Sequence, residues 1–439
     1  MLDELYTADE ARAAEAGHDV AELMERAGAA VAREVLQRYP DARRIAVVCG
    51  GGSNGGDGRI AARILREQGR DAVETEAVER ADLIVDALFG TGFRGEPRAE
   101  AAATIERINA AAVPVVAVDV PSGVDASTGE VAGGAVRATL TVTFHGRKLG
   151  LAVAPGLFHA GEVVVADIGL ERRETEHRLV TAAILALVPP KRAEDSKYSA
   201  GSVLVAGGAP GLTGAACLAA EAAFRADAGY VAVAVPEASL GVAEAKLLEP
   251  VKLTWPHALD AAAKADVLAI GPGLGRDAAA ARLRAQLLAA GDHALVLDAD
   301  ALHELEPGEW GSRAVLTPHA GELARLLGED AVWVGAHRLE AARRGAERFG
   351  CVCLLKGADT IVAAPGEGVL VAVADAPGLA TAGTGDVLTG ILAAFLAKGL
   401  EPRLAAAAAA VAHALAARSL PRRGVVASDL LAALPAVLP

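Results

Sequence analysis

The feature that most constrains this fold is a repeated order of short apolar run, glycine-rich or acidic loop, and helical stretch. This order predicts parallel sheets with helices on both faces. The strands expected in the first half are 44–49, 82–88, 113–120, 138–144 and 162–168. Those expected in the second half are 202–206, 230–235, 267–270, 294–297, 314–316 and 351–355, then a hairpin of 360–364 and 369–373, with two or three helices after Gly383.

The two halves are separated by a charged stretch that begins at Glu171 and by the pair Pro189-Pro190. Proline does not continue regular structure, so a domain boundary is expected in this region. We predict two doubly wound α/β domains, 1–178 and 179–439. The hydrophobic share of 53% excludes a disordered chain and is sufficient for two large cores.

The charge balance limits the partners that the protein can have. The net charge is −14 and there is no run rich in Lys or Arg, which argues against a nucleic acid or an anionic membrane. The first residues are acidic and lack a basic and apolar leader, so we expect a cytoplasmic protein. The alanine-rich stretch 404–420 contains His413 and Arg418 and indicates a packed helix rather than a membrane span.

The loop 50–58 follows the first expected strand and precedes a helical stretch. It contains the pattern G-x-G-x-x-G, and backbone N–H groups in such a turn can hold an anion such as a pyrophosphate. No Lys-Ser or Lys-Thr follows, so the loop is not a Walker A motif. A dehydrogenase would need an acid about twenty residues further on, for which Glu74 or Glu76 is available. The loop by itself is therefore compatible both with a dehydrogenase that binds a dinucleotide and with a glycine-rich turn that binds no ligand.

Two further acids end expected strands of the first half, Asp86 and Asp119. A carboxylate at such a position must be paired, hydrogen-bonded or bound to a metal, because burial penalises its charged form. Asn54, Asp86 and Ser122 offer oxygen ligands that suit a monovalent or divalent cation. Either acid by itself could simply cap a helix or tether a loop, but together they favour a site.

These motifs, 52–58, 86–95, 118–123 and 148–150, resemble the NAD(P)H-hydrate epimerase domain, a Rossmann-like domain. The resemblance implies interconversion of the R and S forms of NAD(P)HX, and it implies that Asn54, Asp86 and Ser122 bind potassium. Substrate contacts are implied for Asn54, Gly55, Gly56, Asp57, Gly90, Thr91, Gly92 and Gly95, and for Asp119. The family usually has Asn where this chain has Ser53. Because the hydrated ring is a carbinolamine at C6, a base can open and reclose it, and Asp119 is the candidate base or orienter.

The second half carries a similar set of loops, at 207–215, 271–275, 297–300, 317–322 and 356–360. Near the end of the chain, Thr381-Ala382-Gly383-Thr384-Gly385-Asp386 runs directly into a helical stretch. Glycines at a helix start expose N–H groups to an anion, and an Asp behind them can accept a hydroxyl proton. An isolated Asp there would more often be a helix cap. Lys356 is placed to meet phosphate, and His319 has no metal-spaced partner, so a ligand contact or a loop hydrogen bond is expected of it.

From about residue 197 onward these motifs resemble the ADP- or ATP-dependent NAD(P)H-hydrate dehydratase, a ribokinase-like enzyme. The resemblance implies that a nucleoside phosphate, ADP with Mg²⁺, drives the loss of water from S-NAD(P)HX. Asp386 is the implied base for the hydroxyl that is phosphorylated and expelled. Substrate contacts are implied for Ala215, Gly275 and His319, and nucleotide contacts for Lys356, Gly357, Ala358, Asp359, Thr360 and Gly385.

The leading hypothesis is a bifunctional repair enzyme for NADHX and NADPHX, expected to be a homo-oligomer. The alternative is a ribokinase-like small-molecule kinase fused to a Rossmann dinucleotide-binding module, because the arrangement around Asp386 also suits simple phosphoryl transfer. A third hypothesis treats the first half as a binding domain that has lost its activity. The only feature that favours it is Ser53, which replaces the usual Asn of the family.

Overall fold

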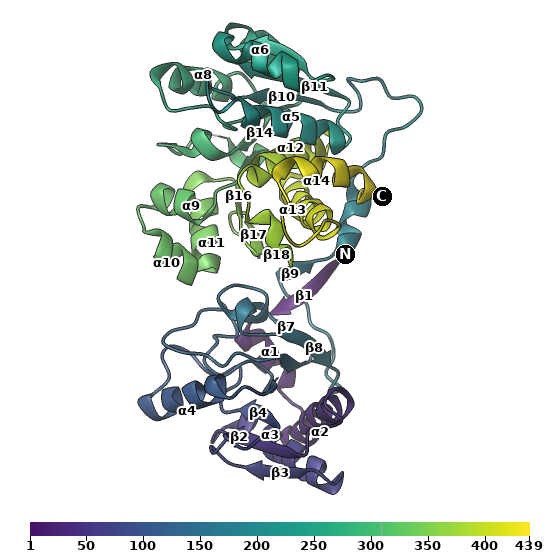
Figure 1. The fold of residues 1–439 in the computed structure, drawn as a ribbon, viewed down its shortest axis with the longest axis vertical. Coiled ribbons are helices and arrows are strands. Elements are labelled where there is room, and N and C mark those ends of the chain that lie inside the picture. Colours follow the sequence, from purple (N-terminus) through teal and green to yellow (C-terminus); the bar gives the residue numbers. More distant parts are fainter. Residues whose placement is uncertain (309) are drawn as a thin grey trace. The chain divides into compact units, whose positions relative to one another are not determined.

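The computed structural model describes residues 1–308 and 310–439. The chain forms two compact units, each with its own sheet (Figure 1). The N-terminal unit contains Glu4–Arg178 and Gly335–His337, and the C-terminal unit contains Met1–Asp3, Leu179–Val334 and Arg338–Pro439. The α/β class expected from the alternating pattern is confirmed.

The N-terminal unit is built on a parallel six-stranded sheet in the order β3-β2-β4-β5-β6-β8. Its strands are β2 (Arg44–Cys49), β3 (Asp71–Glu74), β4 (Leu83–Ala87), β5 (Val115–Val118), β6 (Leu140–Phe144) and β8 (Glu162–Ala166). Its helices are α1 (Ala8–Glu15), α2 (Val20–Arg38), α3 (Ser53–Glu67) and α4 (Ala99–Ala110). A parallel pair outside this sheet joins Tyr6 of β1 (Leu2–Tyr6) to Lys148 of β7 (Arg147–Lys148).

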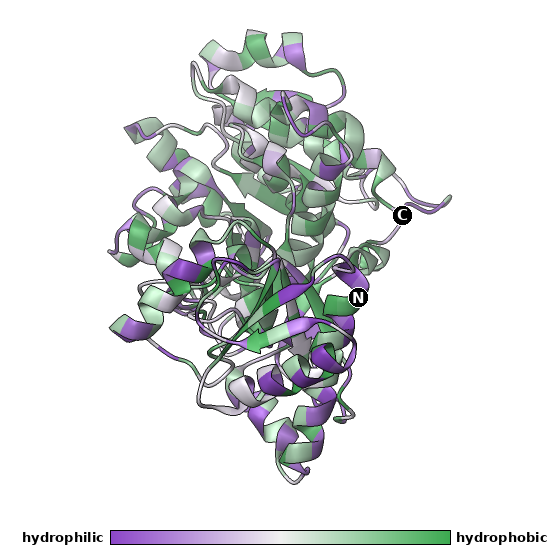
Figure 2. Ribbon diagram, turned by 60° about the horizontal axis from the view of Figure 1, so that its bottom comes forward, coloured by the Kyte–Doolittle hydropathy of each residue, from purple (hydrophilic) through white to green (hydrophobic). Residues whose placement is uncertain are grey.

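Both faces of this sheet are buried. Successive side chains of a strand point to opposite sides, and here the side chains on both sides are apolar and covered by helices. Ile45 and Val47 of β2 pack in the core cluster formed with α2 and α3. Ala46 and Val48 of the same strand pack with α4 on the other face. Figure 2 shows mainly hydrophobic residues in the strands, whereas the helices combine hydrophobic and hydrophilic residues. The sheet is therefore doubly wound, and its ligand-binding edge lies at the carboxyl ends of the strands.

The C-terminal unit contains a larger sheet whose strands run in the order β12-β11-β10-β13-β14-β15-β16-β17-β18. Pairing is parallel from β12 to β16, and β17 and β18 are antiparallel. The strands are β10 (Ser202–Ala206), β11 (Tyr230–Val235), β12 (Val251–Thr254), β13 (Val267–Ile270), β14 (Ala294–Leu297), β15 (Ala314–Leu316), β16 (Val352–Leu355), β17 (Asp359–Ala363) and β18 (Leu370–Val373). β9 (His177–Val180) spans the division between the units.

Helices cover both faces of this sheet as well. The helices of this part of the chain are α5 (Thr213–Arg225), α6 (Glu237–Lys246), α7 (Ala258–Ala262), α8 (Ala278–Leu288), α9 (Ala320–Leu327), α10 (Ala331–Ala336), α11 (Arg338–Phe349), α12 (Thr384–Ala397), α13 (Pro402–Arg418) and α14 (Ala427–Ala433). The core of one face includes α5, α12, α13 and α14, which lie together in Figure 1. The core of the other face includes residues of α7, α8, α9 and α11.

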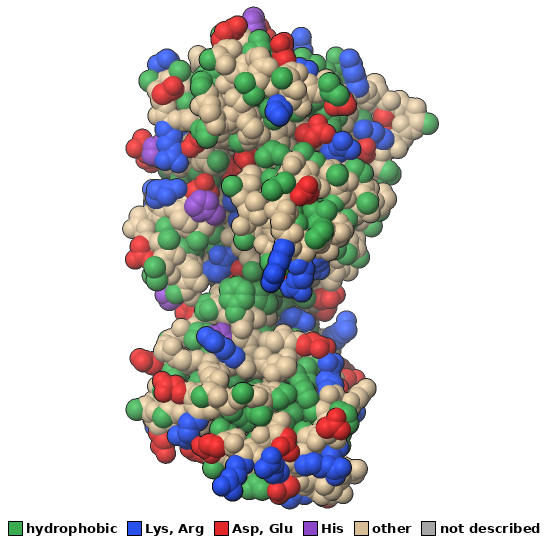
Figure 3. All heavy atoms as spheres, viewed as in Figure 1, with side chains coloured by type: hydrophobic (Ala, Val, Ile, Leu, Met, Phe, Trp, Pro, Cys, Tyr) green, Lys and Arg blue, Asp and Glu red, His purple; other side chains and the backbone are tan. Residues whose placement is uncertain are grey.

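Small residues allow the helices of the first face to pack closely. α13 is alanine-rich and almost entirely buried, as expected of a packed helix. At Gly390 of α12 an added Cβ would lie 2.1 Å from the carbonyl oxygen of Ala219 in α5, so the two backbones meet where only glycine fits. No helix in the described chain is long and apolar enough to span a membrane. On the face drawn in Figure 3, Lys and Arg side chains lie among Asp and Glu side chains.

The expected strands all form, most of them with the predicted bounds or one to two residues shorter, while 113–120 is reduced to β5 and 360–364 is shifted by one residue in β17. β1, β3, β7, β9 and β12 were not predicted. β3 and β12 carry polar residues and are largely exposed or half-buried, so they lack the apolar run that marks the central strands. The four cysteines form no disulfide among the described residues.

The contact between α12 and α5 yields a stability prediction. Gly390→Ala should destabilise the protein by about 1–3 kcal/mol, because the new methyl group forces the two helices apart. The matched control is Gly241→Ala on α6, where an added Cβ meets nothing within 4 Å. It should stabilise the protein by about 0.5–1 kcal/mol, since alanine is the better helix former. Urea unfolding of both variants measures the two changes in stability. Equal unfolding midpoints of the two variants would contradict the close contact of α12 with α5.

Candidate active sites

The first candidate site begins at the glycines 50–52, which connect β2 to α3. Gly52 is the N-cap of this helix and contributes no side-chain hydrogen bond to the first turn. The leading N–H groups and the positive end of the helix dipole are therefore available to an anion. The expected substrate contacts Asn54, Gly55, Gly56 and Asp57 all lie in the first turns of α3.

Asn54, Asp86 and Ser122, the expected cation ligands, belong to one hydrogen-bonded cluster. The Ser122 hydroxyl donates to Asp86 Oδ1 at 2.6 Å, and the Ser122 N–H donates to Oδ2 at 2.8 Å. Asn54 Nδ2 donates to the Phe89 carbonyl at 2.9 Å, and the Phe89 N–H donates to Ser122 Oγ at 2.8 Å. The loop after β4 thus connects all three residues.

The cluster fits a hard cation. Asp86 is completely buried, and burial raises the pKa of its carboxyl to about 6, although the hydrogen bonds from Ser122 and Leu88 favour its charged form. The groups that act on Asp86 are these neutral donors, and no Lys or Arg is among them. Carboxylate, hydroxyl and amide oxygens are the ligands that cations such as potassium accept. A bound cation would offset the desolvation of Asp86 that these neutral donors only partly relieve.

The loop that follows this cluster holds the expected contacts Gly90, Thr91, Gly92 and Gly95. Thr91 is half-buried, and Gly92 and Gly95 are exposed. The Phe89 and Phe93 rings stack at 4.7 Å between centroids, which braces the start of the loop. The loop therefore lies at the protein surface, next in the chain to the buried cluster.

Asp119 follows β5 and is held by a buried lysine. Lys148 Nζ lies 2.5 Å from Asp119 Oδ1, and the Thr143 hydroxyl donates to the same oxygen at 3.0 Å. Lys148 also donates to the Phe144 carbonyl at 2.8 Å. Asp119 adopts a positive φ of 66°, which costs energy for a residue other than glycine and marks a position fixed by its surroundings. The structure thus holds the Asp119 carboxylate in one orientation.

Asp57 has a different environment. It is 8% exposed, and its Oδ1 has no hydrogen-bond partner among the described residues. Burial, followed by the negative charges of Asp119 and Glu15, raises the pKa of Asp57 to about 8, and only Lys148 opposes the shift. Two carboxyl groups with opposite environments therefore face this site.

The second candidate site lies at the carboxyl edge of the C-terminal unit's sheet. The loop before α5 and the loop after β13 are joined by the N–H of Gly208, which donates to the Pro272 carbonyl at 3.0 Å, and by the N–H of Ala209, which donates to the Gly273 carbonyl at 2.6 Å. An added Cβ at Gly273 would lie 3.2 Å from that of Ala215. The expected contact Ala215, in the first turn of α5, thus lies next to the loop that carries Gly275.

A buried network of charges occupies the centre of this edge. Lys356 Nζ lies 2.7 Å from Asp298 Oδ1, and the Thr389 hydroxyl of α12 donates to Asp298 Oδ2 at 2.8 Å. Glu322 Oε2 lies 3.9 Å from Lys356 Nζ. Burial favours loss of the Lys356 proton, but Asp298 and Glu322 outweigh it and raise the pKa of the lysine. Lys356 is therefore a fixed cation.

Asp386 lies in the first turn of α12, close to this network. Burial and the neighbouring charge of Asp298 raise the pKa of Asp386 to about 7, while Lys356 lowers it. Gly383 is the N-cap of α12 with φ 92°, and no side chain caps the helix. An added Cβ at Gly385 would lie 3.4 Å from Lys356 Nζ, so the lysine flanks the open helix end. An anion held here would meet a cation and free N–H groups beside a carboxyl that titrates near neutral pH.

The loop 356–360, which contains the expected nucleotide contacts, is held from behind by Arg338 of α11. Arg338 Nε lies 2.8 Å from Asp359 Oδ1, and both side chains are buried. Its Nη2 donates to the Lys356 carbonyl at 3.3 Å, and the Thr360 hydroxyl donates to the Gly357 carbonyl at 3.1 Å. Asp359 thus serves the loop's own structure, whereas Gly357 and Ala358 form its turn.

His319 is an exposed helix cap in this structure. Its Nδ1 accepts hydrogen bonds from the N–H groups of Gly321 and Glu322 at 3.0 and 3.3 Å, and Glu322 Oε2 accepts from the His319 N–H at 2.8 Å. This capping box begins α9 and accounts for the loop hydrogen bond expected of His319. Nε2 remains at the surface, next to Glu322 at 3.4 Å.

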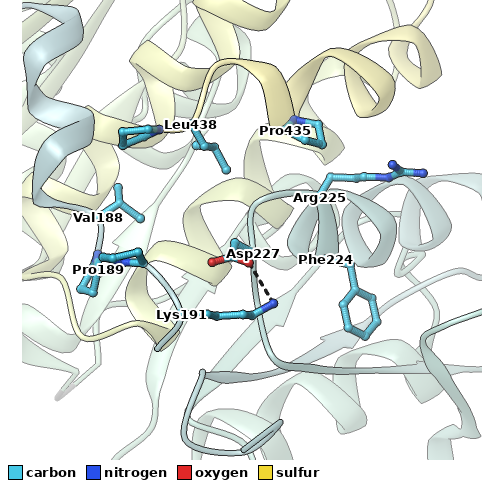
Figure 4. Close-up of a pocket in the computed structure, with 10 residues that line it drawn as sticks. Val188, Pro189, Lys191, Phe224, Arg225, Asp227, Pro435 and Leu438 are labelled. Atoms are coloured by element: carbon cyan, nitrogen blue, oxygen red, sulfur yellow. Dashed lines mark ion pairs between the residues drawn. The ribbon is translucent and has the colours of Figure 1, made fainter. Parts of the chain in front are cut away.

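A pocket of about 530 Å³ lies elsewhere in the C-terminal unit (Figure 4). It is lined by the end of α5, by 188–191 and by the last residues of the chain. Within it Lys191 pairs with Asp227 at 2.8 Å, as the dashed line in Figure 4 marks. Because α5 runs back from the carboxyl edge, this pocket is at the opposite end of the sheet from the candidate site.

Several residues of these sites were not among the predicted contacts. Lys148 and Asp298 lie in motifs that the sequence displays, and Glu322 ends the Thr-Pro-His-x-Gly-Glu motif. Thr389 and Arg338 have no such signal, because each lies in a helical stretch outside the motifs that the sequence displays. Only the packing of α12 and α11 brings them to their carboxylates.

Relatives of this chain extend over nearly its whole length. A family model described as NAD(P)H-hydrate dehydratase matches residues 203–437, and one described as YjeF-related protein N-terminus matches residues 20–75 and 68–150. The bifunctional NAD(P)H-hydrate repair enzyme of Moorella thermoacetica is 40% identical, over 95% of this chain and 92% of that protein. The protein of the same name from Pyrobaculum aerophilum is 39% identical, over 95% of this chain and 93% of that one.

A solved structure is also similar. It is the ADP/ATP-dependent NAD(P)H-hydrate dehydratase of Bacillus subtilis, co-crystallised with ATP and Mg²⁺. The two structures match with a TM-score of 0.53 and 28% sequence identity, over 58% of this chain and 96% of that one. A ribokinase-like superfamily protein of Enterococcus faecalis also matches, with a TM-score of 0.56 and 26% identity, over 61% of this chain and 97% of that one. The two matches support a ribokinase-like fold for the C-terminal unit.

The charge network predicts how Asp386 responds to the loss of its neighbour. In Lys356→Met the pKa of Asp386 should rise above about 7, by roughly 1–3 pH units, because the cation that favours its charged form is gone. Carbon-13 NMR titration of the aspartate carboxyls measures this value. Lys264→Met, at an exposed position, is the control and should leave the Asp386 titration in place. An unchanged titration in Lys356→Met would show that the two groups do not interact.

Proposed function

This chain belongs to the family of bifunctional NAD(P)H-hydrate repair enzymes, and from that premise we propose which unit and which residues perform each reaction. The protein is an enzyme that restores hydrated nicotinamide cofactors. The N-terminal unit is the epimerase, which interconverts R- and S-NAD(P)HX. The C-terminal unit is the dehydratase, which converts S-NAD(P)HX to NAD(P)H while ADP is split into AMP and phosphate.

In the epimerase, the substrate's phosphates are held by the N-terminus of α3 and by the loop Gly90–Gly95, and its hydrated ring faces Asp119. The support is the open helix end, which has no side-chain cap, and the fixed orientation of the Asp119 carboxylate. Asp119 takes the hydroxyl proton when the ring opens and returns it when the ring recloses. Asn54, Asp86 and Ser122 would hold potassium, which supplies positive charge close to the bound phosphates.

In the dehydratase, ADP occupies the loop 356–360 and the N-terminus of α12. Asp386 accepts the proton of the ring hydroxyl as its oxygen attacks the terminal phosphorus of ADP, and AMP leaves. Breaking the C6–O bond then releases phosphate, and loss of a proton from C5 forms the double bond of NAD(P)H. Lys356 balances the charge of the transferred phosphoryl group. Mg²⁺ would neutralise the phosphates of the nucleotide at this edge of the sheet.

The observation that carries this proposal is the position of Asp386 beside an uncapped helix end and a fixed cation. That arrangement alone would also serve the alternative, a small-molecule kinase fused to a dinucleotide-binding module. The repair reaction is favoured because relatives with that name match both halves of the chain together. The family resemblance also leads us to propose a homo-oligomer in the cytoplasm that accepts both NADHX and NADPHX.

The dehydratase assignment is tested by recovery of NADH absorbance from S-NADHX and ADP. Asp386→Asn should lower kcat by about 10²–10⁴-fold, the usual range for loss of a general base. In the wild type the rate should rise with pH through about 7, because Asp386 must lose its proton to act as the base. The R-to-S interconversion should be unaffected by Asp386→Asn. Transfer of phosphate to a small hydroxyl compound without NADH formation would instead favour the kinase.

The potassium assignment predicts an ion effect confined to the epimerase. Replacing potassium with tetramethylammonium should slow epimerisation and leave dehydration of the S form unchanged. Potassium should also raise the thermal midpoint of the wild type but not that of Asp86→Asn, since this substitution removes the charged ligand. Equal midpoints of the wild type in both salts would argue against a cation at this cluster.

A further inference from the structure

We propose that Asp57 is the general acid of the epimerase and works opposite the Asp119 carboxylate. This inference rests on the proposed function of the N-terminal unit and adds a proton donor to it. A ring that opens at C6 must gain a proton at N1 while its hydroxyl loses one. Two groups in opposite protonation states are therefore needed, and a single Asp119 supplies only one of them.

The hydrogen bonds favour a charged carboxylate at Asp119 and a protonated carboxyl group at Asp57, as these two roles require. Asp119 Oδ1 receives Lys148 at 2.5 Å, the Thr143 hydroxyl at 3.0 Å and the Phe144 N–H at 3.4 Å. These donors stabilise a negative charge on Asp119. Asp57 is buried to a similar extent, yet its Oδ1 has no partner in the described chain and no cation pairs with it. A buried carboxyl group with an oxygen that no donor reaches favours its protonated form.

The charges that face Asp57 act in the same direction. They come from Asp119 after β5, from Glu15 at the end of α1 and from Lys148 of β7. Two acids and one lysine surround it, and the lysine is already committed to Asp119. Burial first, and then the two acids, raise the pKa of Asp57 to about 8. Burial and Asp119 also raise the pKa of Glu15. Paired carboxyl groups whose environments differ in this way divide the acid and base roles between them.

The proton balance of the reaction is closed. Asp119 takes the hydroxyl proton at C6, the O–H electron pair forms the C6=O bond, and the N1–C6 bond breaks with its pair going to N1. Asp57 gives its proton to N1, so the open form is an amino-aldehyde. Rotation about C5–C6 presents the other face of the carbonyl group. N1 then attacks C6, Asp57 recovers the proton from N1, and Asp119 returns its proton to the oxygen, so nothing is consumed.

The test uses the full-length protein with R-NADHX and compares Asp57→Asn with the wild type. Asparagine keeps the size and hydrogen-bonding capacity of the side chain but cannot donate a proton. We expect a loss of about 10²–10⁴-fold in kcat for epimerisation with little change in KM. Dehydration of S-NADHX in the same chain should proceed at the wild-type rate. Asp57→Glu should recover part of the activity.

The control on the same helix is Glu67→Gln, an exposed acid at the far end of α3, which should epimerise normally. Epimerisation by Asp57→Asn within a few-fold of the wild type would overturn the inference. Failure of the wild type to interconvert the epimers would instead contradict the proposed function of the N-terminal unit. The two failures are therefore distinguishable in one series of assays.

The pH dependence gives a readout that a merely structural role would not change. Wild-type epimerisation should fall as the pH rises through about 8, because Asp57 then loses the proton that it must donate. Glu15→Gln removes one of the negative charges and should move this fall to lower pH. If Asp57→Asn does not fold, carbon-13 NMR of the wild type decides the question. A carboxyl titration of Asp57 near its ordinary value would refute the inference.

Discussion

Carboxylates at the ends of buried strands impose the constraint on which both sites depend. Asp86 is the next-to-last residue of β4, Asp119 and Asp298 directly follow β5 and β14, and all three are almost completely removed from water. A charge in such a place is stable only with donors or cations around it. The three acids meet this requirement differently, through the Ser122 hydroxyl, the Lys148 ammonium and the Lys356 ammonium. Each partner comes from a different strand or loop than its acid, so each site forms only when the unit around it has folded.

The same constraint explains how a protein with a net charge of −14 can handle nucleotides. Its buried lysines are already paired with acids, and their charge is largely balanced within the site. Phosphates must therefore be bound chiefly by N–H groups, and both α3 and α12 begin without a side-chain cap. The glycine-rich loops are needed to open these helix ends. Long-range electrostatic attraction has little part in such binding.

The two sites also share an arrangement of acids. In each, one carboxylate is held by a lysine, and a second acid near the start of a helix is buried beside it. Burial and the neighbouring negative charge raise the pKa of Asp57 to about 8 and of Asp386 to about 7. These acids therefore exchange protons near neutral pH, as a group that moves a proton in catalysis must. The units differ in what the proton transfer serves: ring opening in one and phosphoryl transfer in the other.

Local pattern determined the central strands, the glycine loops and the acids after them, because apolar run length, glycine content and residue type are all properties of short segments. The edge strands β3 and β12 were missed since polar, half-exposed residues leave no such pattern. Only the tertiary structure decided the partners of the acids, because Lys148, Lys356 and Thr389 reach carboxylates that are 29, 58 and 91 residues away. It also decided which acids hold a proton, since burial and neighbouring charge exist only after the sheets have formed and the helices have packed on them.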